Sequence, residues 1–158
     1  MNQKNTNYLL KKYPKLYAQY NWDKTQTCMC WGFDVRNGWF KLIDGLSKRI
    51  TKLDPEGKIQ ASQTKEKFGG LRFYIDASGL SDEQLKEVRE LINIAETKSF
   101  HICEECGKKG KLRDTAGWYK TLCERHYKQI SNPEYLLKQW AKRRKFRHEK
   151  NTKYKVKQ

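Results

Sequence analysis

The segment CEECG at residues 103–107 is followed by the segment CERH at residues 123–126, and sixteen residues separate Cys106 from Cys123. Each segment places two metal-binding side chains three positions apart, so that both can bind one ion, and Gly107 permits a tight turn after the first pair. Three thiolates and one imidazole complete a tetrahedral set for Zn²⁺. The spacing therefore predicts one structural zinc ion bound by Cys103, Cys106, Cys123 and His126.

The residues between the two pairs predict how this metal module folds. Gly110 and Gly117 favour turns, residues 118–122 suit a β-strand, and the second pair lies at the start of a helix. A knuckle, a hairpin and a helix in this order are typical of a treble-clef zinc ribbon. His101 is an alternative fourth ligand. Cys28 and Cys30 lack further ligands in their neighbourhood, and we interpret them as buried cysteines.

The first hundred residues predict an α+β module. Apolar residues recur at three- and four-residue steps from Trp39 to Leu53, which is the periodicity of a helix that ends before a turn at residues 54–57. Residues 59–64 and 71–75 alternate as strands, and a Gly-Gly turn joins them into a hairpin. Ser81 begins a second amphipathic helix with a capping box. We therefore expect helices packed on one face of the sheet.

Signals outside this helix–hairpin–helix unit are weaker. Residues 8–20 predict a short helical stretch that Pro14 interrupts, and residues 27–33 suit either a strand or a loop. Ser131 and Glu134 predict the capping box of a further, strongly basic helix. The expected organisation is an α+β module at residues 1–100, a zinc ribbon at residues 101–130, and a basic C-terminal helix and tail at residues 131–158.

The charge of the chain points to an anionic partner. The 158 residues include 34 Lys and Arg against 18 Asp and Glu, which gives a net charge of +16. A surface of this kind attracts nucleic acid, nucleotides or an acidic protein, although the charge can also serve only to keep a chain in solution. The sequence shows neither a membrane-spanning apolar run nor a secretion signal, and its cysteine count is odd. These features predict a cytoplasmic location and no membrane partner.

Two basic segments are the candidate ligand-binding surfaces. The hairpin segment combines cations, a Gly-Gly turn whose amides can face an anion, and aromatic rings on which a base can stack. Its candidate residues are Lys65, Lys67, Gly69, Gly70, Arg72 and Tyr74. The tail contains a cluster of cations with one interleaved ring. Its candidate residues are Lys142, Arg143, Arg144, Lys145 and Arg147. In both segments the alternative is ordinary solvent-exposed charge.

Several of these strings together resemble a known group of sequences. They are WGF at residues 31–33, GWF at 38–40, KEKFGGLRFY at 65–74, CEECG at 103–107, and GW at 117–118 followed by LCERH at 122–126. In this combination the chain resembles an uncharacterised family of small zinc-ribbon proteins of bacteriophages and bacteria, over about residues 13–127. The resemblance implies a phage or prophage setting, with the bacterial host cytoplasm as the location, and it implies no activity.

Three functions are compatible with these features. The first is a non-enzymatic module that binds nucleic acid, and it best accounts for the charge. The second is an anti-defence protein that sequesters a nucleotide immune signal, and the third is an inhibitor or adaptor of a host protein. Catalysis is less favoured, because the chain has only three histidines and lacks a nucleophile motif or a P-loop.

Overall fold

A computed structural model describes residues 1–115, 117–134 and 137, which form a mixed α+β structure. The chain comprises two compact units, residues 1–123 and 124–158. The principal elements of the first unit are α1 (Gln3–Lys12), β1 (Phe33–Asp34), α2 (Phe40–Leu53), β2 (Ile59–Lys67), β3 (Gly70–Ala77), α3 (Asp82–Ser99), β4 (Lys111–Asp114) and β5 (Tyr119–Leu122). The second unit begins with α4 (Glu124–Ser131). The predicted three-part division of the chain stays a prediction, and the candidate ligands of the tail lie outside the described residues.

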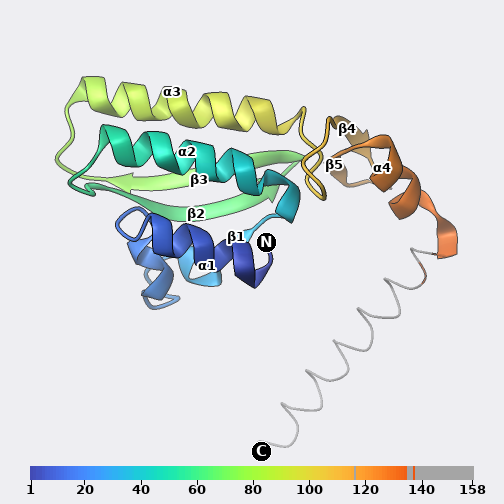
Figure 1. Cartoon of the computed structure of the whole chain (residues 1–158), viewed down its shortest axis with the longest axis horizontal. Helices are drawn as coiled ribbons and strands as arrows, with labels where there is room; N and C mark the ends of the chain where they lie inside the picture. The colour runs from blue at the N-terminus through green and yellow to red at the C-terminus, as the bar shows by residue number, and fades with distance from the viewer. Residues whose placement is uncertain (116, 135–136, 138–158) are drawn as a thin grey trace, which may run out of the picture. The chain divides into compact units, whose positions relative to one another are not determined.

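The helix–hairpin–helix prediction is confirmed. The predicted apolar stripe is buried at Trp39, just before α2, and at Ile43, Leu46 and Ile50 within α2. At the start of α3 the Ser81 side chain accepts a hydrogen bond from the backbone N–H of Gln84, and the reciprocal bond completes the capping box. These two helices pack against each other, and α3 packs on β3 (Figure 1).

The main sheet has the strand order β1–β2–β3, with β1 parallel and β3 antiparallel to β2. Alternation along β3 sends Leu71 and Phe73 into the core, whereas Tyr74 on the opposite face is exposed. Two backbone N–H groups on the outer edge of β3 are already hydrogen-bonded to side chains of α3, so another strand cannot pair with them. The Ser99 hydroxyl accepts from the backbone N–H of Leu71, and the Glu96 carboxylate accepts from that of Phe73.

Helix α1 begins earlier than the sequence predicted. The Asn2 side chain caps it by accepting from the backbone N–H of Asn5, and the helix ends at Lys12, before Pro14 as expected. It contacts α2 through an edge-to-face pair of Tyr8 with Phe40, whose ring centroids are 5.4 Å apart. A salt bridge of 2.9 Å between Lys12 and Asp44 joins the same two helices.

The structure corrects two further predictions. Cys28 is exposed and Cys30 half-buried, because the short 3₁₀-helix η2 (Met29–Trp31) turns Met29 into the core instead. The cap predicted at Ser131 is also displaced by one residue. Ser131 ends α4, and Asn132 accepts the hydrogen bond from the backbone N–H of Glu134. Within the described part of the chain, no helix has the length and apolar character to cross a membrane.

Candidate metal centre and surrounding surfaces

The predicted metal ligands converge in the structure. The ligand atoms of Cys103, Cys106, Cys123 and His126 all lie within 4.8 Å of one another, and this is the only such group among the described residues. The alternative ligand His101 does not belong to it. Three thiols and one imidazole in this arrangement can hold a metal ion. The predicted convergence of these residues is confirmed, and the binding of zinc by them stays a prediction.

The distance between two of the sulfur atoms suits coordination of a metal rather than a disulfide bond. The Sγ atoms of Cys106 and Cys123 are 3.8 Å apart. This separation is far from the S–S length of about 2.05 Å in a disulfide. It matches the edge of a tetrahedron whose metal–sulfur bonds are about 2.3 Å long. The donor set and its spacing therefore fit a tetrahedral ion that prefers sulfur and nitrogen ligands.

The surroundings of Cys103 affect the state of its thiol. Burial raises the pKa of Cys103 above its ordinary value, although backbone N–H groups of Cys123, Cys106 and Glu105 lower it by hydrogen bonding to the sulfur. A bound cation would favour the thiolate, and the same N–H groups would then stabilise the sulfur's negative charge. The backbone of the knuckle is thus already arranged around a thiolate ligand.

The knuckle packs against the loop that precedes α2, the 3₁₀-helix η3 (Asn37–Trp39). The backbone N–H of Gly38 donates to the carbonyl oxygen of Glu104 at 2.7 Å, and the indole of Trp39 donates to that of Ile102 at 2.8 Å. A Cβ at Gly38 would overlap the carbonyl oxygen of Cys103. Gly38 and Trp39 therefore connect the metal-binding segment to the α+β core, a role that the sequence did not indicate.

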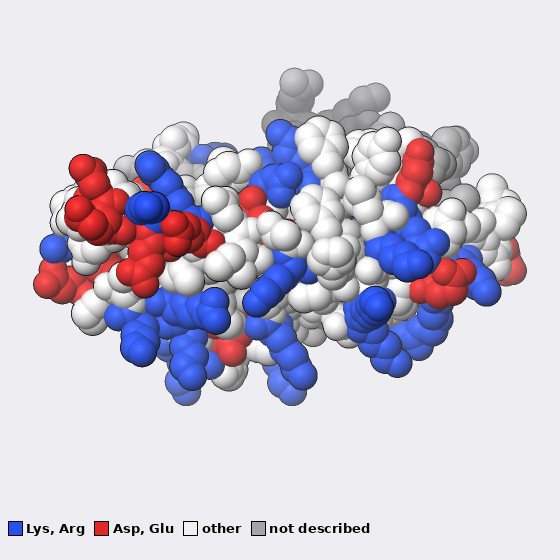
Figure 2. Space-filling view, turned by 90° about the horizontal axis from the view of Figure 1, so that it is seen from above, with Lys and Arg blue, Asp and Glu red and all other residues white. Residues whose placement is uncertain are grey.

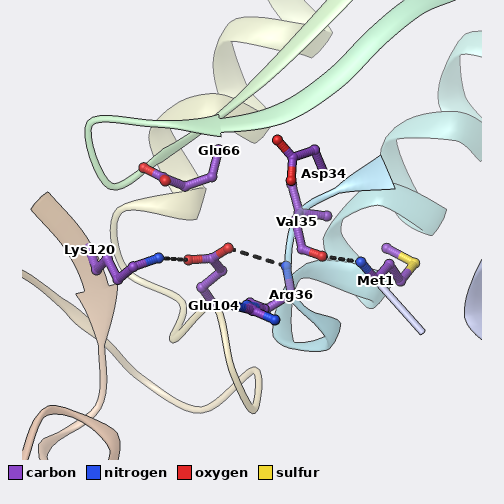
Figure 3. Close-up of a pocket in the computed structure, with 7 residues that line it drawn as sticks. All are labelled: Met1, Asp34, Val35, Arg36, Glu66, Glu104 and Lys120. Carbon is purple, nitrogen blue, oxygen red and sulfur yellow. Dashed lines mark hydrogen bonds and ion pairs between the residues drawn. The ribbon is translucent and has the colours of Figure 1, made fainter. Parts of the chain in front are cut away.

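A polar cavity of about 230 Å³ lies beside the knuckle (Figure 3). Its centre is Glu104, which is 3% exposed and whose Oε1 accepts from the backbone N–H of Arg36. Lys120 lies 3.5 Å from Oε2, and burial raises the pKa of this carboxyl although the Lys120 charge lowers it. The carboxylates of Asp34 and Glu66 also line the cavity. Sequence reasoning missed this cluster because Glu104 has no sequence signal beyond its place between two ligands.

The side chains predicted to bind a ligand on the hairpin lie on or beside the exposed sheet face. The ammonium groups of Lys65 and Lys67 lie over the rings of Tyr74 and Phe68, each 5.3 Å from the ring centroid. Arg72 is half-buried, and its guanidinium forms a 3.6 Å ion pair with Glu96 on α3. Among these three cations, Arg72 is thus the one whose charge is paired with an acidic side chain of the protein.

The two glycines of the hairpin lie close to neighbouring side chains, and Gly69 also has a positive φ of 78°. A Cβ at Gly69 would overlap the Leu112 side chain on β4, and a Cβ at Gly70 would overlap the ring of Phe100. The backbone N–H of Gly69 donates to Oε1 of Glu66 at 2.6 Å, and the Gly69 carbonyl accepts from Thr121 at 2.6 Å. The Gly69 amide is therefore satisfied within the protein. Binding of a ligand by either glycine stays a prediction.

Exposed cations far outnumber acids on α1 and α2. We call the following seven exposed cations the basic helix face: Lys4, Lys11, Lys12, Lys41, Lys48, Arg49 and Lys52. Asp44 is the only acid of the two helices, and Lys12 and Tyr13 both bind its carboxylate. Helix α3 differs, with five acids against three cations. Figure 2 shows Lys and Arg gathered along the lower edge of the view, apart from a group of acidic residues at its left.

Comparison with known proteins gives no information on function, which is therefore inferred from the structure. Neither a protein-family model, nor a curated protein, nor a solved structure matches the chain.

Proposed function

We propose that the protein is a non-enzymatic, zinc-containing module that binds nucleic acid through phosphate contacts. The basic helix face is the observation that supports this proposal best. Seven cations are exposed on two adjacent helices, and the single acid among them is bound by Lys12 and Tyr13. Such a surface binds a regular row of phosphates by releasing counterions, with affinity that depends strongly on salt.

We assign the Cys₃His group to a structural zinc ion in a treble-clef-like ribbon. Thiolate and imidazole ligands favour zinc, and four protein ligands leave no position for a reacting water molecule. The order of knuckle, β4–β5 hairpin and α4 supports the ribbon. The phage or prophage setting rests on the sequence resemblance alone. Metal analysis of the purified protein, with one zinc per chain as the expected result, tests this assignment.

The described cavity does not favour the alternative of a nucleotide-sequestering protein. That hypothesis called for a pocket lined by Arg72, Tyr74 and tryptophans. None of these lines the described cavity, where the acids Asp34, Glu66 and Glu104 lie beside Arg36, Lys120 and the N-terminal residue Met1. The exposed cations of α1 and α2 are spread over two helices that contact each other, which suits a polymer of phosphates better than a single small molecule.

A salt titration with a matched control tests the proposal. If about five cations of the basic helix face contact phosphates, the log of the duplex affinity should fall against log salt with a slope near −4.5. The variant K41E/K48E/K52E on α2 should weaken binding and reduce that slope by about 3. The control K86E/R89E/K98E makes the same charge change on α3, among its acids, and should have a smaller effect. Equal effects of the two variants, or no binding by the parent protein at low salt, would contradict the proposal.

A further inference from the structure

The tip of the β2–β3 hairpin presents a phenylalanine in a conformation that folding alone does not explain. Phe68 is the only described non-glycine residue with positive φ, at 53°, and its side chain is 65% exposed. A side chain with a Cβ is disfavoured in this region, where glycine or asparagine is the ordinary choice. An exposed ring also adds little burial. The backbone conformation of Phe68 therefore destabilises the fold, and the burial of its side chain does not compensate for this. Such strained residues are typical of functional positions.

Phe68 belongs to a row of rings and cations, which we call the hairpin strip: Lys65, Lys67, Phe68 and Tyr74. Each aromatic ring has a lysine ammonium 5.3 Å from its centroid. Tyr74 is 43% exposed and lies on the sheet face opposite the core. Glu66, the acid within this segment, uses its Oε1 to accept the backbone N–H of Gly69. The strip therefore offers flat apolar surfaces next to positive charge.

The tip is held in place by the rest of its unit. Thr121 on β5 donates a hydrogen bond to the carbonyl oxygen of Gly69, and Leu112 fills the space next to the same glycine. The outer edge of β3 is engaged by Ser99 and Glu96, so an added strand cannot pair with Leu71 and Phe73 there. The strip leaves ring surface and ammonium groups accessible, and a flexible lysine side chain lies over each ring. A base that stacks on that face of a ring would displace the lysine toward the adjacent phosphate.

We propose that the hairpin strip binds unpaired bases of a single-stranded nucleic acid. The bases stack on Phe68 and Tyr74, and the adjacent phosphates are bound by Lys67 and Lys65. Stacking on aromatic side chains tolerates any base, but it needs a base face that is not covered by neighbouring bases in a duplex. This inference rests on the proposed function and names the form of nucleic acid that this second surface selects.

Variants of the two rings test the inference in the full chain. The probe is a short fluorescein-labelled oligothymidylate, used alone and annealed to oligodeoxyadenylate, and the readout is fluorescence anisotropy. Phe68→Gly removes the ring and suits the positive φ, and Tyr74→Leu keeps an apolar strand residue. Each should weaken single-strand binding about 10-fold and leave duplex binding nearly unchanged. Trp31→Ala is the control, because Trp31 is 74% exposed but lies outside the strip.

Each outcome has a distinct meaning. Single-strand affinities of Phe68→Gly and Tyr74→Leu equal to that of the parent protein overturn the inference, and so does an equal loss with Trp31→Ala. In both cases the proposed function stands if K41E/K48E/K52E still weakens duplex binding. If the parent protein binds neither probe at low salt, the proposed function itself fails and the strip has no nucleic-acid ligand.

Discussion

The α+β module and the metal-binding segment at residues 101–123 belong to one compact unit but are stabilised differently. Eighteen buried apolar residues, from Leu9 to Ala95, form the core of the module. Among the described residues of the segment, which leave out residue 116, only Cys103 and Leu122 are buried apolar residues. Burial of apolar surface is the dominant stabilising term in most folds, so a segment with so little of it needs another source of stability. We propose that metal coordination by the Cys₃His group supplies it.

Among the predicted effects on stability, loss of the metal should be the largest, and it should affect the two regions differently. We expect the Cys106→Ser variant, or removal of the ion with a chelator, to unfold residues 101–123 while α2, α3 and the β2–β3 hairpin stay folded. Metal binding to sites of this kind contributes about 10 kcal/mol or more of folding free energy. Hydrogen exchange should show rapid exchange at the amides of Cys103 and Gly107, with protection retained at Leu71.

The chain supplies a matched control for this prediction. Cys28 is an exposed cysteine outside the ligand group, so Cys28→Ser should change neither the metal content nor the exchange pattern. Full protection of the knuckle in metal-free protein would show that packing alone holds the segment, and the comparison of the two regions would then be wrong.

Features that depend on residues close together in the sequence could be predicted, whereas features that depend on contacts between distant residues could not. The helices α2 and α3, the hairpin and the grouping of the three cysteines with His126 were predictable, because periodicity and short ligand spacings are local signals. The packing of Gly38 on the knuckle and the burial of Glu104 depend on contacts between residues more than sixty positions apart. Gly69 shows the same limit, since its packing partner Leu112 could not be identified from its own segment.

The contact between the two regions should be the next most sensitive point. In Gly38→Ala the new Cβ would overlap the Cys103 carbonyl oxygen, and backbone atoms cannot move aside as a flexible side chain can. We expect a loss of about 2 to 3 kcal/mol in the free energy of unfolding, together with weaker metal binding. Denaturant unfolding and competition with a chromophoric chelator measure the two quantities.

Gly45 provides the control for Gly38. It lies inside α2 with no atom near the position of an added Cβ. Gly45→Ala should therefore stabilise the protein by about 0.5 to 1 kcal/mol without altering metal affinity. If Gly38→Ala leaves metal affinity unchanged, the knuckle does not depend on the module, and the two regions are more independent than their contacts indicate.

The smallest effect concerns backbone strain at the hairpin tip, which belongs to the module and not to the metal segment. Phe68→Gly relieves a left-handed backbone conformation that destabilises the protein by about 1 to 2 kcal/mol. Part of this stabilisation is offset by the greater entropy of glycine in the unfolded chain. We expect a net stabilisation of about 0.5 kcal/mol, whereas Phe68→Ala keeps the strain and should not stabilise. Gly79 has a φ of 69° and open space around it, so Gly79→Ala would introduce the backbone strain that Phe68→Gly removes. We therefore expect Gly79→Ala to destabilise the protein. Because these residues belong to the module, the metal content of all three variants should equal that of the parent protein. A lower metal content in Phe68→Gly would instead show that the tip, through the bond from Thr121 to Gly69, helps to hold the metal-binding segment.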